Sequence, residues 1–200
     1  MISHQLRQLR DLLGYSVMSG DKPLGKLTGL AFDPADWAIR AAVVDDPVTS
    51  RDLVQIPIGL FRALADERRE LCFDYAGEAV LPAGGPGHSV PAEAAALLGR
   101  QVAGGGQVAG SIDDLIVNID SWQLRYLVVR TGTGRVLTDI EWCSSLGEDG
   151  QCLSLDLPAA AVTGAPPFEG LDRLCIGHEE ALYRHYTSRK YAGDSEVAQE

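Results

Sequence analysis

Two pairs of side chains in this sequence combine an aromatic ring with a cation at the same spacing. They are Trp37 with Arg40 and Trp122 with Arg125, three residues apart in each pair. Trp and Arg are frequent anchors of protein–protein interfaces, because the ring buries a large area and the guanidinium stacks on rings or pairs with carboxylates. We therefore predict that these four side chains contact a partner protein.

The repeated pattern also has a structural interpretation. Each Trp would then cover the end of a β-barrel, while each Arg reaches outward to a ring or to a carboxylate such as Asp33 or Asp120. Both interpretations describe packing and binding, and neither describes bond-making chemistry.

Adjacent carboxylates at Asp45–Asp46 and Asp113–Asp114 are the first candidates for metal or acid–base work. Neighbouring residues in a strand point to opposite faces, so such pairs converge poorly on one site. We expect solvated carboxylates in turns or at strand ends. The glycines at 104–106 precede a strand rather than a helix, which predicts a hairpin turn and not a phosphate site.

Histidine and cysteine give no stronger signal. His178 and His185 could share a helix face with Glu179 or Glu180, but a metal site needs a further fixed ligand, so an exposed polar face is favoured. No Ser–His–Asp or Cys–His arrangement can be assembled, so we predict a non-enzymatic protein without metal, flavin or haem. The four cysteines form no CxxC pair and are expected to be reduced, buried or indifferent thiols: Cys72, Cys143, Cys152 and Cys175.

Composition limits the class of partner. The 200 residues are 46 % hydrophobic and 22 % charged, as in an ordinary globular protein, and carry a net charge of −11. That charge disfavours nucleic acid and anionic lipid, which are bound by clustered Lys and Arg. No stretch reaches the roughly 18 to 20 apolar residues of a membrane span, and residues 1–10 lack the apolar run of a signal peptide. We therefore expect a cytoplasmic protein.

The chain repeats itself. Leu12-Leu13-Gly14 recurs as Leu97-Leu98-Gly99, a shift of 85 residues that holds to Val44 and Val129 and becomes 82 after a short deletion. The shared residues are mostly glycines and aliphatic residues, which indicates a duplicated scaffold. We predict that the two copies superpose, with Trp37 on Trp122 in like environments, about a pseudo-two-fold axis of the kind an ancestral dimer leaves.

Short β-type runs separated by turn residues predict an all-β fold of two small tandem barrels, because closure removes exposed strand edges. We place the first barrel, with an N-terminal helix within Ser3–Leu13, at residues 1–82, a linker with a short helix at 83–96, the second barrel at 97–166 and a tail at 167–200. The predicted strands are Tyr15–Met18, Leu24–Phe32, Ile39–Val44, Leu53–Pro57 and Leu71–Phe73, then Gln101–Ala103, Val108–Val117, Leu124–Arg130, Arg135–Ile140 and Cys152–Leu155.

The tail has a character of its own. Glu179–Tyr191 carries aromatic residues at helical spacing, including Tyr183 and Tyr186. This apolar surface is too large for a free terminus, so we expect the tail to pack on a barrel, with the tyrosine hydroxyls at water. Both tyrosines are also predicted partner contacts, and residues 193–200 are expected to be disordered.

Both copies resemble the PRC-barrel family. The similarity rests on Gly-x4-Gly, an Asp and W-x-[IL]-R before a Val-rich strand, in the segments 12–44 and 99–129, and it covers most of the chain. The family includes the cytoplasmic domain of the photosynthetic reaction-centre H subunit and the C-terminal domain of the ribosome-maturation factor RimM. Residues 179–186 resemble the closing segment of H-subunit-type and double PRC-barrel proteins. Because the sequence shows no counterpart of the H-subunit membrane helix or of the separate N-terminal domain of RimM, we expect neither of these family-specific parts here.

The resemblance implies a β-barrel adaptor without catalytic residues. We therefore expect a protein-binding adaptor or assembly factor for a larger bacterial complex, with a protein partner. The alternative is an accessory subunit of a photosynthetic or respiratory electron-transfer complex, in which surface carboxylates relay protons. The oligomeric state stays open, with a homodimer as one alternative.

Overall fold

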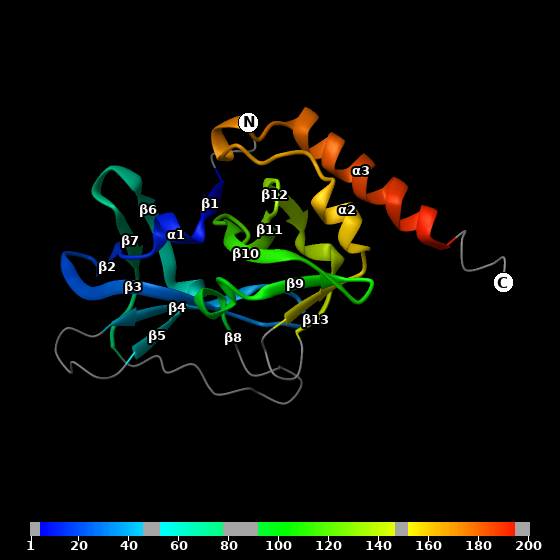
Figure 1. Ribbon diagram of the computed structural model, residues 1–200. Helices are drawn as coiled ribbons and strands as arrows, with labels where there is room; N and C mark the ends of the chain where they lie inside the picture. Colours follow the sequence, from blue (N-terminus) through cyan, green and yellow to red (C-terminus); the bar gives the residue numbers. More distant parts are fainter. Residues whose placement is uncertain (1–4, 46–52, 78–91, 147–151, 195–200) are drawn as a thin grey trace. The chain divides into compact units, whose positions relative to one another are not determined.

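The computed structural model describes residues 5–45, 53–77, 92–146 and 152–194 (Figure 1). The chain is mainly β, with two seven-stranded sheets, which confirms the predicted all-β class. It divides into two compact units. Unit 1 comprises residues 1–6, 97–118 and 125–200, and unit 2 comprises residues 7–96 and 119–124.

Unit 2 contains the sheet ordered β5-β4-β3-β2-β7-β6, with β8 paired to β3. The β2–β7 pair is parallel and its neighbours are antiparallel. The strands are β2 (Ser16–Ser19), β3 (Lys22–Phe32), β4 (Ile39–Asp45), β5 (Leu53–Pro57), β6 (Phe61–Ala65), β7 (Glu70–Phe73) and β8 (Ala92–Glu93). Short helical segments are α1 (Leu9–Leu12), η1 (Ile58–Leu60), η2 (Asp66–Arg68) and η3 (Ala94–Leu97).

Unit 1 contains the sheet ordered β12-β11-β10-β9-β14-β13. The short strand β1 comprises Leu6–Gln8. Here β9 and β14 form the parallel pair. The other strands are β9 (Gln101–Gly104), β10 (Gln107–Asn118), β11 (Gln123–Thr131), β12 (Gly134–Asp139), β13 (Cys143–Leu146) and β14 (Cys152–Leu155). The helical segments are η4 (Ile140–Trp142), α2 (Ala159–Thr163), η5 (Leu171–Arg173) and α3 (Ile176–Asp194).

The two sheets share their strand order and several local details. Gly14 N donates to Leu27 O at 2.8 Å, and Gly99 N donates to Ile112 O at 2.7 Å, at positions related by the 85-residue shift. The β2–β3 hairpin has a register shift between Val17 and Met18, and the β9–β10 hairpin has one between Val108 and Gly110.

A close backbone approach explains one repeated glycine. A Cβ atom at Gly25 would lie 1.8 Å from the carbonyl oxygen of Asp45, and one at Gly110 would lie 2.2 Å from that of Arg130. No side chain fits at such distances, so the close approach of β3 to β4, and of β10 to β11, requires glycine in both copies.

The predicted strands are present, with ends that differ by at most two residues. The sequence did not predict β6 and β13, because Phe61–Ala65 and Cys143–Leu146 are rich in Ala, Arg or Ser and lack clear apolar alternation. It also did not predict the short strands β1 and β8, which lie where helices were expected. The predicted N-terminal helix is a single turn, α1, and the linker helix is the short η3. The proline- and glycine-rich part of the predicted linker, residues 82–89, lies outside the described residues, as does Asp46.

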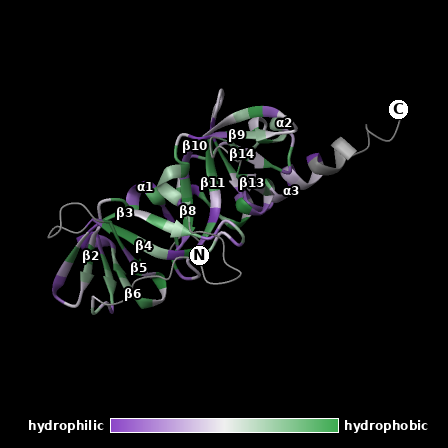
Figure 2. Ribbon diagram, turned by 90° about the horizontal axis from the view of Figure 1, so that it is seen from below, coloured by the Kyte–Doolittle hydropathy of each residue, from purple (hydrophilic) through white to green (hydrophobic). Residues whose placement is uncertain are grey.

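Each sheet has an apolar core (Figure 2). In unit 1, Leu115, Ile116 and Val117 of β10 are fully buried, as are Ala161 and Val162 of α2. Burying a large aliphatic side chain stabilises a fold by about 1.5–3 kcal/mol. None of the helices among the described residues is long and apolar enough to cross a membrane.

Candidate binding site

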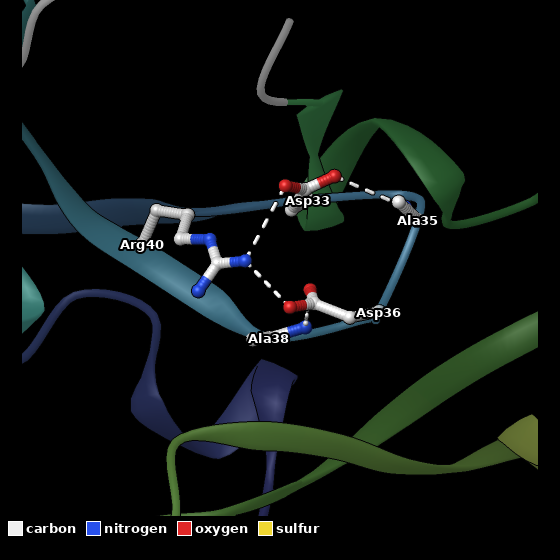
Figure 3. Close-up of polar contacts among 5 residues, drawn as sticks. All are labelled: Asp33, Ala35, Asp36, Ala38 and Arg40. Atoms are coloured by element: carbon white, nitrogen blue, oxygen red, sulfur yellow. Dashed lines mark hydrogen bonds and ion pairs between the residues drawn. The ribbon is translucent and has the colours of Figure 1, made fainter. Parts of the chain in front are cut away.

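In unit 2, polar contacts join Arg40 to the turn between Asp33 and Ala38 (Figure 3). Asp33 is 4 % exposed and accepts from Ala35 N at 3.0 Å, and Arg40 Nη2 lies 3.3 Å from Asp33 Oδ2 and 2.6 Å from Asp36 Oδ2. A buried carboxylate is costly unless it is paired, so Arg40 stabilises this turn. The predicted Arg40–Asp33 pair is confirmed.

The two tryptophans share a backbone conformation but not a ring environment. Trp37 and Trp122 have φ angles of 59° and 51°, in a region that L-residues rarely adopt. The Trp37 ring stacks on Phe32, with centroids 5.3 Å apart, whereas the Trp122 ring meets Phe61 edge-on at 4.8 Å. The prediction of like environments is therefore wrong at the rings. In the other copy, valine and cysteine occupy the positions of Phe32 and Phe61, so neither contact can be repeated.

Arg125 is surrounded differently from Arg40. Its Nη2 lies 3.2 Å from Asp139 Oδ2, and its Nη1 lies 3.8 Å from Glu141 Oε1. Asn118 and Ser121 stand where the first copy has Asp33 and Asp36, so the second copy lacks the carboxylates that hold Arg40. Arg125 reaches the carboxylates at the end of β12 and in η4 and lies over the Tyr126 ring, so the prediction that it meets a carboxylate or a ring is confirmed.

Arg125 lies in a cleft of about 700 Å³ between α3 and the residues of β11, the end of β12 and η4. All residues that line this cleft belong to unit 1. We call it the α3 cleft. Its sheet side is formed by Arg125 and Tyr126 of β11 with Asp139, Glu141 and Trp142, and its helix side by α3 residues between Glu179 and Ser188.

Several contacts hold α3 in place. Leu182 is 4 % exposed and Tyr186 is 1 % exposed. The Tyr186 hydroxyl donates to Leu137 O at 2.6 Å and lies 3.2 Å from Thr138 Oγ1. His185 Nε2 is 2.7 Å from Ala161 O of α2, which lies near α3 in Figure 1. These contacts make the cleft a preformed feature of unit 1.

A further hydrogen bond crosses the cleft itself. The Tyr126 hydroxyl donates to Glu179 Oε1 at 2.7 Å, and the Tyr126 side chain is nearly fully buried. Burial and this bond raise the pKa of Tyr126, so it remains a neutral donor. One oxygen of the Glu179 carboxylate is thus held by a hydroxyl group that carries no charge.

The electrostatics of the cleft are acidic. Its lining contains four carboxylates, at Asp139, Glu141, Glu179 and Glu180, and two guanidinium groups, at Arg125 and Arg184. Burial raises the pKa of Asp139, and the nearby charges of Glu141 and Glu179 add to that effect.

Of the six contact residues predicted from the sequence, three line this cleft: Arg125, Tyr183 and Tyr186. Trp37, Arg40 and Trp122 lie in unit 2, where Trp122 is only 8 % exposed. Tyr126, Asp139, Glu141 and Trp142 were not predicted from the sequence, and Glu179 was considered only as a possible metal ligand beside a histidine. A signal was present, because Thr138-Asp139-Ile140-Glu141-Trp142 replaces the apolar Ile56-Pro57-Ile58-Gly59-Leu60 of the first copy.

The tail prediction is correct in part. Leu174, Leu182 and Tyr186 are buried, which agrees with the expected packing of the tail, whereas Ile176 is 58 % exposed and Tyr183 is 70 % exposed. The Tyr186 hydroxyl is bonded inside the protein instead of facing water. Helix α3 continues through Gly193 and Asp194, which were expected to be disordered, and residues 195–200 lie outside the described residues.

The predicted carboxylate pair, the cysteines and the glycine-rich turn lie in different settings. Asp114 is buried at 4 % exposure and accepts from Leu115 N, so the prediction of a solvated carboxylate is wrong there. Asp113 pairs with Arg130. The four cysteines are free thiols, and Cys175 is exposed. Residues 104–107 make the predicted hairpin turn between β9 and β10.

No protein-family model matches the chain, and no curated protein matches its sequence.

Proposed function

We propose that this protein is a non-enzymatic adaptor or assembly factor for a larger bacterial complex, and that it binds its protein partner through the α3 cleft. The observation that carries the proposal is Tyr183, whose ring is 70 % exposed in the lining of a 700 Å³ cleft. An exposed aromatic side chain beside a preformed cleft is well suited to anchor a protein interface, because little conformational entropy is lost on binding.

The fold that we propose is a pair of PRC-type barrels, produced by duplication, in a cytoplasmic protein. Support comes from the matched strand orders, the parallel pair in each sheet and the positive φ angle of both tryptophans. Gly25 and Gly110 also support the duplication, since both copies need glycine for the same close approach of neighbouring strands.

A second function is favoured by one observation. The raised pKa of Asp139 brings its carboxyl group closer to neutral pH, as in a group that accepts and releases protons. Asp139 beside Glu141 and Glu179 would then relay protons in an accessory subunit of an electron-transfer complex.

The adaptor proposal is tested by comparing tagged full-length chains purified from the native host. Wild type, Tyr183→Ala and a control, Val108→Ala, are used, because Val108 is 59 % exposed and does not line the cleft. Partners are identified by mass spectrometry, purified and titrated against each variant. We expect Tyr183→Ala to weaken binding by at least about tenfold, the loss typical of an interface anchor, and Val108→Ala to bind like wild type. Equal binding by all three proteins would overturn the assignment of the cleft.

A further inference from the structure

The α3 cleft combines negative charge with aromatic rings. Glu141 is 76 % exposed at its side chain, and Glu180 is also exposed, so both carboxylates can meet an incoming group. Asp139 and Glu141 share the single guanidinium of Arg125. Glu179 accepts a hydrogen bond from the neutral Tyr126 hydroxyl, and no ion pair to Glu179 is found among the described residues.

The rings lie in the same lining. Tyr183 is exposed, and Trp142 is half-buried with its ring centroid 6.4 Å from that of Tyr186. Aromatic faces attract cations, most strongly where water is partly excluded. A guanidinium already uses this chemistry here, since Arg125 lies 5.1 Å from the ring centroid of Tyr126.

We propose that the α3 cleft binds an arginine side chain presented by a peptide segment of the partner protein. The inference rests on the proposed adaptor function and specifies its partner. An arginine matches both features of the cleft, because its planar guanidinium stacks on Trp142 or Tyr183 while it pairs with Glu180 or Glu141.

Size and charge favour a peptide over other occupants. A cleft of about 700 Å³ holds a side chain together with neighbouring residues, and a free arginine would fill a small part of it. The net charge of −11 favours a basic protein segment and opposes a nucleic acid.

The test uses the full chain and a synthetic probe, the acetylated and amidated peptide Gly-Ser-Leu-Ala-Arg-Ala-Leu-Ser-Gly. Its matched control carries citrulline, which has the same shape without the charge. The indole N–H signals of the three tryptophans are followed by NMR, with Trp142 assigned from Trp142→Phe. We expect the arginine peptide to shift the Trp142 signal and leave those of Trp37 and Trp122 in place.

Charge is then tested separately from shape. We expect the citrulline peptide to bind at least about tenfold more weakly, and the affinity of the arginine peptide to fall as salt is added. Glu180→Gln should weaken the arginine peptide several-fold. Glu169→Gln makes the same charge change at an exposed residue outside the cleft and should bind like wild type.

Three outcomes would overturn the inference: equal binding of both peptides, no Trp142 shift at millimolar peptide, or equal affinity for acetyl-arginine amide. If they occur while a purified partner still depends on Tyr183, the adaptor function stands and only the arginine assignment fails. If the peptide binds in the cleft but no partner depends on Tyr183, the cleft fails as the binding surface of the adaptor and the chemistry of the cleft stands.

Discussion

Ala38 and Gln123 form an isolated antiparallel bridge within unit 2. The flanking hydrogen bonds are reciprocal, from Ile39 N to Trp122 O at 2.7 Å and from Leu124 N to Trp37 O at 3.0 Å. Because Ala38 and Gln123 are separated by the 85-residue shift, the bridge joins equivalent positions of the two copies. Such self-complementary pairing is what a two-fold interface between identical chains produces, so the bridge supports the proposed duplication.

Trp122 and Trp37 are expected to differ in their effect on stability. Trp122→Ala removes a ring that is 8 % exposed and lies against Phe61, so we expect a loss of about 3 to 5 kcal/mol of unfolding free energy. Trp37 is only half-buried, and Trp37→Ala should cost less. Urea unfolding of both variants decides the order. Equal losses of unfolding free energy in the two variants would contradict the argument from burial.

Gly25 and Gly110, at the close approaches of neighbouring strands, are expected to be intolerant of any side chain. Gly25→Ala and Gly110→Ala each place a Cβ atom against a backbone carbonyl, and each should cost about 2 to 4 kcal/mol because backbone must move. Gly29→Ala is the control, since its nearest contact would be Ala95 Cβ at 3.7 Å. Thermal unfolding of the three variants checks this. A loss for Gly29→Ala as large as the other two would count against the close-approach argument.

Tyr186 and Tyr183 separate the structural side of α3 from its contact side. Tyr186→Phe removes the hydroxyl bonds to Leu137 O and Thr138 Oγ1, so about 1 to 2 kcal/mol of stability should be lost. Tyr183→Ala removes an exposed ring and should change stability by less than about 0.5 kcal/mol. Denaturant titrations measure both, and a large loss for Tyr183→Ala would place that ring in the core.

The strand pattern was predictable because it depends on local residue types. Val-rich runs such as Leu124–Arg130, which lies between the turn residues 118–121 and 131–134, have few alternatives to a strand. The cleft was not predictable in the same way. Tyr126 and Glu179 are 53 residues apart, and only the return of α3 to the sheet brings their side chains together. Spacing rules relate neighbours on one element and carry no information about such contacts.

The last prediction concerns the pH dependence of stability through Asp139. Burial raises the pKa of this carboxyl, and Glu141 and Glu179 add to the effect, although the Glu141 backbone N–H and Arg125 oppose it. The folded protein therefore holds the Asp139 proton more tightly than the unfolded chain. It follows that the contribution of Asp139 to stability falls as pH rises from the unfolded pKa of about 4 through the raised folded pKa, and is constant above that value.

Asp139→Asn removes this titration, so the stability of wild type relative to Asp139→Asn should decline with rising pH across that window and then level off. Urea unfolding of both proteins between about pH 3.5 and 8 measures the difference, in a range set by the ordinary carboxyl pKa and by neutrality. Asp172→Asn, at a carboxylate that is 82 % exposed, controls for the change in net charge. If the difference instead rises with pH, the Arg125 pair outweighs burial and the pKa of Asp139 is lowered. That result would leave the adaptor proposal intact and remove the observation that favours a proton relay, because a carboxyl group ionised well below neutral pH carries no proton to transfer.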